Sequence, residues 1–241
     1  MPAPDIQVIP SPAELARFAA ASWLDQLADR TDDSPYSVAL SGGRITKAFF
    51  QSIVEQSAGT TAAFDKVHFF WADERCVPPD DPESNFRMAD ELLFQPLGIA
   101  QKNIHRIHGE LPPQDAAAAA RVDLERFHHL KGTSRPLFDM IFLGMGEDGH
   151  IASLFPGESE ETKSDEASYR SVVAVKPPPN RVTLGYGAIE SATSVTALVS
   201  GTGKESALRE ALAPDGKNPM ARIIQHRDSV RILTDMEIET N

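Results

Sequence analysis

Short apolar runs alternate with longer stretches of helical spacing along this chain. The run at residues 67–71, Val-His-Phe-Phe-Trp, and the run at 138–143, Phe-Asp-Met-Ile-Phe-Leu, are typical of strands with little exposed surface. By the same pattern, the predicted strands cover residues 37–40, 67–71, 138–143, 172–175, 195–199 and 230–233. Most of them are separated by a predicted helix, which favours parallel pairing.

The helices are predicted from apolar residues that recur three or four positions apart. Leu15, Phe18, Ala19 and Trp23 have this spacing, and the alanine-rich segment 114–130 has no internal Gly or Pro. The predicted helices cover residues 14–28, 48–55, 85–93, 114–130 and 203–212, whereas segments 76–82 and 157–168 are predicted as loops, the second exposed and mobile. The alternation predicts an α/β fold in which a single domain, residues 1–241, has a largely parallel, Rossmann-like sheet flanked by helices.

Three predicted strands end in turns that carry glycine or charged residues, at 41–43, 73–75 and 144–150. Ligands of open α/β sheets bind in the crevice outside the carboxyl ends of the strands. We therefore expect these three turns to converge on one binding site.

The first turn, Ser41-Gly42-Gly43-Arg44, lies between a strand and a helix. Glycines let the backbone approach a ligand closely, and the free N–H groups of a helix start attract anions. Ser41 adds a hydroxyl donor. A tight turn without a ligand explains the same residues, so phosphate binding remains a hypothesis at this point. The Gly-Lys-Ser/Thr ending of a nucleotide P-loop is absent, which argues against a nucleoside triphosphate.

The third turn, Gly-Met-Gly-Glu-Asp-Gly-His at 144–150, places His150 two residues after Asp148. Histidine takes up a proton near neutral pH, and a neighbouring carboxylate fixes its tautomer and stabilises the cation. The pattern predicts a general base at His150 supported by Asp148. A glycine-rich turn with a surface histidine is the alternative.

Three further basic residues follow strands or loops: Arg75 in Asp-Glu-Arg, Arg181 in Pro-Pro-Pro-Asn-Arg, and Lys204 in Gly-Thr-Gly-Lys. Arg75 is a candidate for stabilising an oxyanion, because its guanidinium is a planar and permanently charged donor. Arg181 and Lys204 are candidates for phosphate binding. Each is also compatible with an ordinary surface charge.

Composition narrows the class of partner. The formal net charge is −12, which argues against broad binding to nucleic acid. The start of the chain has no signal-peptide pattern, no apolar run approaches the length of a membrane span, and Cys76 is the single cysteine. We therefore predict a cytoplasmic protein that binds neither nucleic acid nor membrane. The histidines show no metal-ligand spacing, and no metal is predicted.

These segments resemble the 6-phosphogluconolactonases. The matching stretches are LSGGR at 40–44, FFWADERCVPPDDPESNF at 69–86, FDMIFLGMGEDGHIASLFPG at 138–157, KPPPNRVTL at 176–184 and VSGTGK at 199–204. The resemblance implies a fold related to the glucosamine-6-phosphate deaminases and hydrolysis of a phosphosugar lactone without a cofactor. It implies His150 and Asp148 as the activators of water, and Arg75 near the ring carbonyl. The phosphate-binding residues that it implies, together with the turn above, are Ser41, Gly42, Gly43, Arg44, Arg181 and Lys204.

The chain departs from the family pattern at Ile45-Thr46, where many members have Thr-Pro, and at Ile151, where threonine is common. The roles of Thr46, Asp73 and Asn85 stay open. A monomer is expected, and a dimer is possible.

Two other functions compete. A deaminase-like enzyme on the same fold would usually have Tyr where Arg75 stands and Asn-Glu-Pro-Gly where the chain has Leu-Phe-Pro-Gly at 154–157. Phe155 then occupies the position of a catalytic glutamate. A non-catalytic sugar-phosphate sensor would need the anion site but neither His150 nor Asp148.

Overall fold

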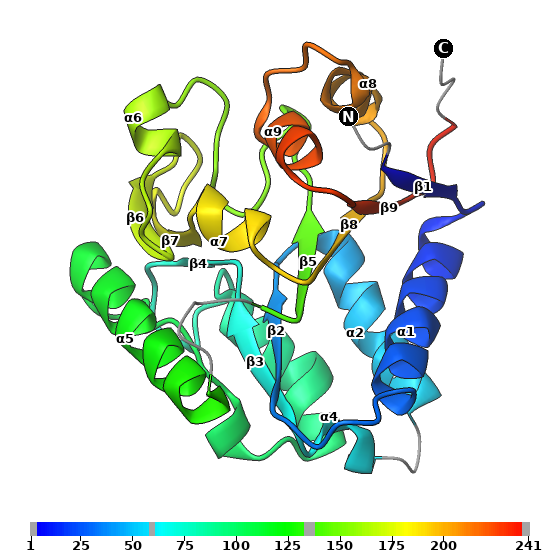
Figure 1. Ribbon diagram of the computed structural model, residues 1–241, viewed down its shortest axis with the longest axis vertical. Coiled ribbons are helices and arrows are strands. Elements are labelled where there is room, and N and C mark those ends of the chain that lie inside the picture. Colours follow the sequence, from blue (N-terminus) through cyan, green and yellow to red (C-terminus); the bar gives the residue numbers. More distant parts are fainter. Residues whose placement is uncertain (1–3, 58–60, 133–137, 238–241) are drawn as a thin grey trace.

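The computed structural model describes residues 4–57, 61–132 and 138–237 (Figure 1). Within these residues the larger sheet is parallel throughout, and its strand order is β1-β9-β8-β5-β2-β3. Its strands are β1 (Asp5–Val8), β2 (Tyr36–Leu40), β3 (Val67–Trp71), β5 (Met140–Gly144), β8 (Ser194–Val199) and β9 (Arg231–Thr234). The predicted α/β class with a largely parallel sheet is confirmed.

A second, antiparallel sheet was not predicted. It has the order β4-β7-β6, with β4 (Asp73–Arg75), β7 (Asn180–Leu184) and β6 (Tyr169–Val173). The turn predicted at 73–75 is therefore a short strand, because its main chain pairs with 181–183. The strand predicted at 172–175 is shifted to 169–173, since Tyr169 is buried and donates its hydroxyl proton to Trp71 O at 2.8 Å, whereas Val175 is fully exposed.

The helices are α1 (Pro12–Ala28), α2 (Arg44–Gln56), α3 (Asn85–Ala89), α4 (Gln95–Leu97), α5 (Pro113–Lys131), α6 (Glu160–Lys163), α7 (Tyr186–Glu190), α8 (Glu205–Leu212) and α9 (Pro219–His226). The five predicted helices overlap α1, α2, α3, α5 and α8, although several bounds differ, whereas α7 and α9 were not predicted. A wider, π-helical turn at Asp90–Phe94 joins α3 to α4, and short 3₁₀ turns lie at Thr61–Phe64 and Gln101–Asn103. The helix predicted at 48–55 begins at Arg44 instead, directly after Gly43 with its φ of 109°.

The segment 157–168 was predicted as a loop, and this is wrong for Glu160–Lys163, which forms α6. Ser159 caps this helix by accepting a hydrogen bond from Thr162 N at 3.2 Å. Glu158 accepts two hydrogen bonds from Arg170 Nη2, at 2.7 and 2.8 Å, and both side chains are largely buried. This part of the chain is thereby attached to β6.

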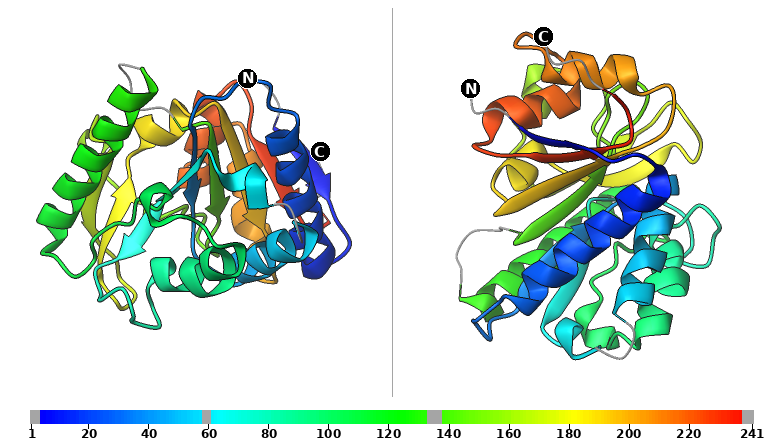
Figure 2. Two further views of the ribbon diagram at one scale, coloured as in Figure 1. Left: turned by 90° about the horizontal axis from the view of Figure 1, so that it is seen from below. Right: turned by 90° about the vertical axis from the view of Figure 1, so that its right-hand side faces the viewer.

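The helices form layers on the two sides of the larger sheet. In two views at right angles, α1 and α2 lie together on one side, and α5 lies on the opposite side beside the small sheet (Figure 2). Trp23 of α1 packs against Phe49 of α2 and Phe142 of β5, with ring centroids 6.2 and 5.4 Å apart. These aromatic contacts join the helical layer to the sheet and fix the start of α2 relative to β5.

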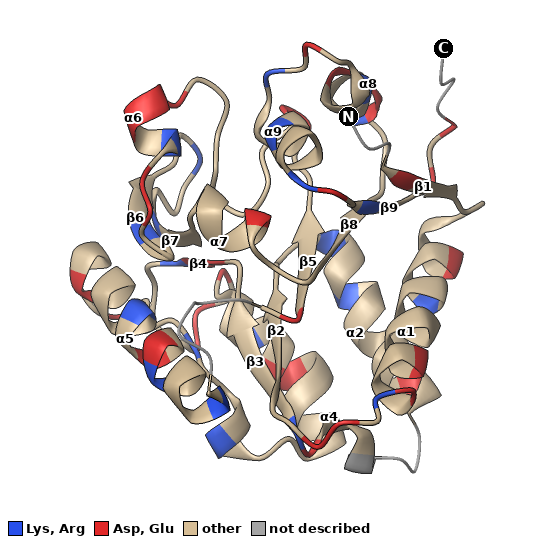
Figure 3. Cartoon of the chain, viewed as in Figure 1, with Lys and Arg blue, Asp and Glu red and all other residues tan. Residues whose placement is uncertain are grey.

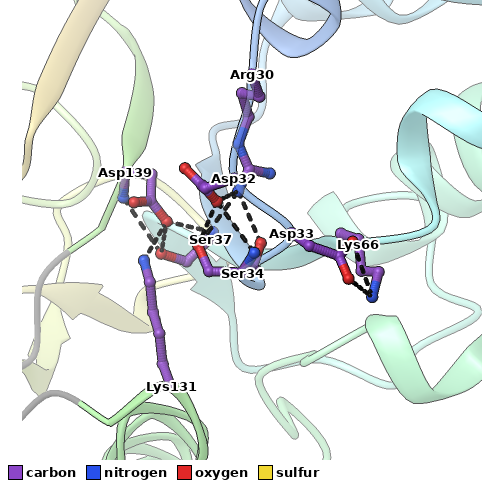
Figure 4. Close-up of polar contacts among 8 residues, drawn as sticks. All are labelled: Arg30, Asp32, Asp33, Ser34, Ser37, Lys66, Lys131 and Asp139. Carbon is purple, nitrogen blue, oxygen red and sulfur yellow. Dashed lines mark hydrogen bonds and ion pairs between the residues drawn. The ribbon is translucent and has the colours of Figure 1, made fainter.

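Charged residues hold the end of the sheet where β2 and β5 begin. Asp139 accepts hydrogen bonds from Ser37 N at 2.7 Å, Ser37 Oγ at 2.9 Å and Lys131 Nζ at 2.5 Å (Figure 4). Elsewhere, acidic and basic positions are interspersed, as along α5 (Figure 3). The turns that follow β2 and β5 lie at the opposite end of these strands from this network.

Candidate active site

A single cleft lies where β2, β5 and β8 end. After β2 the chain adds β3 toward one edge of the sheet, whereas after β5 it adds β8 and β9 toward the other edge. The direction in which strands are added therefore reverses between β2 and β5. Such a reversal is the usual ligand site of an open α/β sheet. The cleft is lined by Ser41, Gly42, Gly43, Arg44, Ile45, Asp73, Arg75, Asn85, Gly144, Met145, His150, Ala152, Arg181, Ser200 and Lys204. The structure thus brings together every predicted site residue except Asp148, which contacts the cleft through His150.

The loop after β5 is folded tightly around its glycines. Gly146 N donates to His150 O at 2.8 Å, and Gly149 N donates to Gly146 O at 3.1 Å. A Cβ atom added to Gly146 would lie 2.1 Å from His150 Nδ1, so position 146 has no room for a side chain. Gly149 has a φ of 80°, a conformation that glycine adopts without strain. The glycines noted in the sequence therefore allow the tight turn that fixes the position of His150.

Asp148 and His150 form a hydrogen-bonded pair at the surface of the cleft. Asp148 Oδ1 lies 2.5 Å from His150 Nδ1 and also accepts a hydrogen bond from His150 N at 3.2 Å. Partial burial raises the pKa of Asp148, but these hydrogen bonds outweigh burial and hold the pKa below its usual value. An ionised Asp148 fixes the proton of the imidazole on Nδ1 and leaves Nε2 as the acceptor. The pair has the geometry of a general base and its orienting carboxylate.

The loop after β2 supplies main-chain groups. Ser41 Oγ donates to Phe142 O at 2.8 Å, so its hydroxyl proton ties this loop to β5. Gly43 occupies the N-cap position of α2 and provides no capping side chain, which leaves the N–H groups of the first turn available to an anion. Thr46, whose role was open, is buried and donates to Gly42 O at 3.0 Å. It supports the loop from behind and does not line the cleft.

Lys204 and Arg44 bring two cations to this side of the cleft. Burial lowers the pKa of Lys204, and the Arg44 cation lowers it further, while Asp235 and Glu147 act in the opposite direction. Two cations that repel each other beside an uncapped helix start are a favourable environment for a phosphate dianion.

Arg75 and Arg181 bring two more cations from the small sheet. They are direct partners across the antiparallel β4–β7 ladder. Burial lowers the pKa of Arg181, an effect that Asp73 opposes and Arg75 reinforces. Like charges directly opposite each other destabilise a sheet, and a bound anion removes that penalty. The unpredicted second sheet therefore has a clear part in the site: it fixes two guanidinium groups at the cleft.

Two buried polar residues of the cleft lining, Asp73 and Asn85, were not assigned roles from the sequence. Asp73 accepts hydrogen bonds from Ser153 Oγ at 2.7 Å and interacts electrostatically with Arg181. Asn85 Nδ2 donates to Asp73 O at 2.9 Å. Both residues lie in charged or polar runs after a strand, which could have marked them as candidate site residues. Their hydrogen-bond partners could not be inferred, because most of them lie far away in the sequence.

Glu74 is the most deeply buried of these carboxyl groups. Burial raises its pKa to about 7, although the main-chain N–H groups of Asn85, Phe86 and Arg75 donate to it and oppose the shift. Its two oxygens accept these three hydrogen bonds at 2.7–2.8 Å. Glu74 thereby joins β4 to the start of α3 and shapes the wall of the cleft.

Cys76 does not contribute a reactive thiol. Burial raises its pKa to about 11, and the Glu74 carboxyl adds to the shift, so the thiol stays protonated at neutral pH. In the part of the chain that the structure describes, no three His, Cys, Asp or Glu side chains gather as a metal site would require. No helix of this part is both long and apolar enough to cross a membrane.

Comparisons with known proteins agree with this arrangement. A family model described as Glucosamine-6-phosphate isomerases/6-phosphogluconolactonase matches residues 10–232. A protein of Haemophilus influenzae named 6-phosphogluconolactonase is 36% identical over 196 residues, which cover 78% of this chain and 80% of that protein. A Synechocystis protein of the same name is 35% identical over 208 residues, which cover 85% and 84%. A solved structure of the 6-phosphogluconolactonase from Trypanosoma cruzi has a TM-score of 0.82 at 26% identity and covers 97% of this chain and 96% of that chain.

Proposed function

The chain belongs to the family of glucosamine-6-phosphate isomerases and 6-phosphogluconolactonases, and we propose that it hydrolyses 6-phosphogluconolactone to 6-phosphogluconate, as in the oxidative pentose phosphate pathway. The observation that carries this proposal is the Asp148–His150 pair, 2.5 Å apart, beside a cleft that four cations line. A base for water and a site for an anionic substrate are what this hydrolysis needs.

Within this family, the surroundings of His150 favour the lactonase reaction. The ring of Phe155 lies against the imidazole, with centroids 5.1 Å apart. This apolar ring provides no acid or base at the place where the deaminase pattern has a glutamate. In a lactone the ring oxygen is the leaving group. It needs only the proton that His150 has already taken from water.

The substrate is held at its phosphate. The first turn of α2 and the cations of Arg44, Arg181 and Lys204 bind the phosphate oxygens. Arg75, whose ladder position is fixed opposite Arg181, lies near the lactone carbonyl. Binding at the remote phosphate orients the carbonyl relative to His150.

Hydrolysis then proceeds in two proton transfers. His150 Nε2 takes a proton from water while the water oxygen attacks the lactone carbonyl, and Asp148 stabilises the imidazolium. Arg75 stabilises the tetrahedral oxyanion. When the oxyanion collapses, the bond to the ring oxygen breaks and His150 returns the proton to that oxygen. The products are a carboxylic acid, which ionises, and a hydroxyl group, and His150 is restored.

The test follows the opening of 6-phosphoglucono-δ-lactone generated in the assay, with the spontaneous rate subtracted. His150→Ala should lower turnover by about two to four powers of ten, because it removes the general base. The affinity for 6-phosphogluconate should change little. His129→Ala, which removes an exposed histidine of α5, is the matched control and should keep full turnover.

The two possible failures have different meanings. Full turnover of His150→Ala would remove this residue from the mechanism but leave the enzyme. If the unmodified protein does not accelerate the reaction at all but binds 6-phosphogluconate, the protein is a sugar-phosphate sensor.

A further inference from the structure

Asn218 lies directly before α9, in a region with no predicted role and outside the residues that line the cleft. Only 2% of its surface is exposed. Its side chain is nevertheless in contact with the loop that carries His150. A buried amide with contacts to several elements constrains the positions of all of them.

Both ends of the Asn218 amide are used. Oδ1 accepts a hydrogen bond from Ala221 N at 2.9 Å and so caps α9. Nδ2 donates to Ala207 O at 2.9 Å, in the first turn of α8. Because α8 begins directly after Lys204, Asn218 links α9 to the helix at whose start the phosphate-binding lysine stands.

The same amide packs against Gly149. A Cβ atom added to Gly149 would lie 2.4 Å from Nδ2 and 2.5 Å from Cγ of Asn218. The first turn of α9 adds a hydrogen bond, since Met220 N donates to Gly149 O at 3.3 Å. Gly149 is the residue between Asp148 and His150, so a shift of Gly149 moves both members of the pair.

We propose that Asn218 is a positioning residue, which acts through Gly149 to hold the Asp148–His150 pair in place relative to the helix of Lys204. The role in turnover rests on the proposed lactonase function. Without the amide, Gly149 has space to move toward α9, and the distance between the base and a phosphate-anchored carbonyl is no longer fixed. Proton transfer depends steeply on that distance, whereas phosphate binding does not.

Asn218→Ser separates this role from simple helix capping. The serine hydroxyl still accepts the N–H of Ala221, since serine is among the preferred N-cap residues, but it is too short to fill the space against Gly149 and to reach Ala207 O. We expect kcat to fall about tenfold while the dissociation constant of 6-phosphogluconate stays within about twofold.

Ser11→Ala is the matched control. It removes the N-cap of α1, where Ser11 Oγ accepts a hydrogen bond from Glu14 N at 3.2 Å. This variant should lose stability and keep its kcat. If Asn218→Ser keeps the kcat of the unmodified protein, or if Ser11→Ala loses as much, Asn218 has no positioning role.

A second readout is independent of turnover. The ¹⁵N resonance of His150 Nδ1 reports its hydrogen bond to Asp148, and this resonance should shift in Asn218→Ser but not in Ser11→Ala. Absence of turnover in the unmodified protein would contradict the proposed function alone. An unchanged His150 resonance in Asn218→Ser would contradict the positioning role alone.

Discussion

Two neighbouring strands, β5 and β8, end in glycine-rich loops that are built in opposite ways. The loop after β5 carries His150 and is closed on itself by main-chain hydrogen bonds. The loop after β8 carries Lys204 and is open: a Cβ atom added to Gly201 would have only Arg44 Nη2 near it, at 4.0 Å. Both loops contain a glycine of positive φ, 80° at Gly149 and 100° at Gly201, but the glycines at 146 and 149 also make room for neighbouring side chains.

The two loops also differ in the residues that contact them. The loop after β8 is held mainly from outside, by Asp235, which accepts hydrogen bonds from Ser200 Oγ at 2.7 Å and Gly201 N at 3.1 Å. The loop after β5 is crowded at Gly146 by the imidazole and the Asp148 carboxylate, and at Gly149 by Asn218. A base must stand within a few tenths of an ångström of its water, but a cation attracts an anion over a longer distance. The two constructions suit the roles proposed for His150 and Lys204.

The largest expected effect comes from adding a methyl group to each loop. Gly146→Ala places Cβ against the His150 ring and should lower kcat by about a hundredfold or more. In Gly201→Ala the added methyl group meets no close neighbour, but alanine is strained at this positive φ. The substitution should therefore lower the free energy of unfolding by about 1 kcal/mol and kcat by less than about threefold. Steady-state kinetics and urea unfolding of both variants test this. Equal losses of kcat would show that the two loops do not differ as described.

A smaller effect is expected at the cation of the open loop. Lys204→Met removes a proposed charged partner of the phosphate and should raise KM about tenfold, which corresponds to about 1.4 kcal/mol, with kcat nearly unchanged. Lys217→Met, which removes an exposed lysine between α8 and α9, is the control of equal charge. A loss in kcat without a change in KM would place Lys204 at the reacting centre.

The smallest effect is a dependence on pH. Burial and the Arg44 cation hold the pKa of Lys204 below its usual value. The phosphate affinity should therefore decline on the alkaline side earlier than an exposed lysine would allow, because Lys204 loses its proton as pH rises through its pKa. Arg44→Gln removes one cause of the shift and should move the decline to higher pH.

Calorimetric titration with 6-phosphogluconate between pH 7 and 10 measures this decline for both proteins. The product is preferable to the lactone, which opens unaided. In Lys204→Arg the decline should disappear from this range, since arginine stays charged. If it persists there, another group is responsible.

The sequence predicts the parts of this molecule that depend on local pattern. The buried strands of the larger sheet have apolar runs, and the glycine-rich turns at their ends mark the cleft, so residues such as Gly43 and His150 were found without the structure. The small sheet was missed because β4 is only Asp-Glu-Arg, whose strand conformation comes from pairing with β7 and not from its own residues. The start of α9 had a usable signal, since Asn218 is followed by Pro219, a typical helix beginning.

The supporting residues of the site could not be predicted in this way. Asp73 and Ser153 are 80 positions apart and meet only in the folded chain. Asn218 acts on Gly149 through a contact between segments that share no pattern. The secondary-structure propensity of a short segment contains no information about such pairs, because the contact forms only when the two segments pack together in the folded chain.

The contact between Gly42 and Asn85 has a consequence for any attempt to redesign the cleft. A Cβ atom added to Gly42 would lie 2.0 Å from Asn85 Oδ1, so position 42 cannot be enlarged while Asn85 keeps its place. The two positions must therefore be changed together, although Gly42 follows β2 and Asn85 begins α3. A library for this cleft would therefore pair each larger residue at position 42 with a smaller one at position 85, which changes the shape of the wall that both residues line.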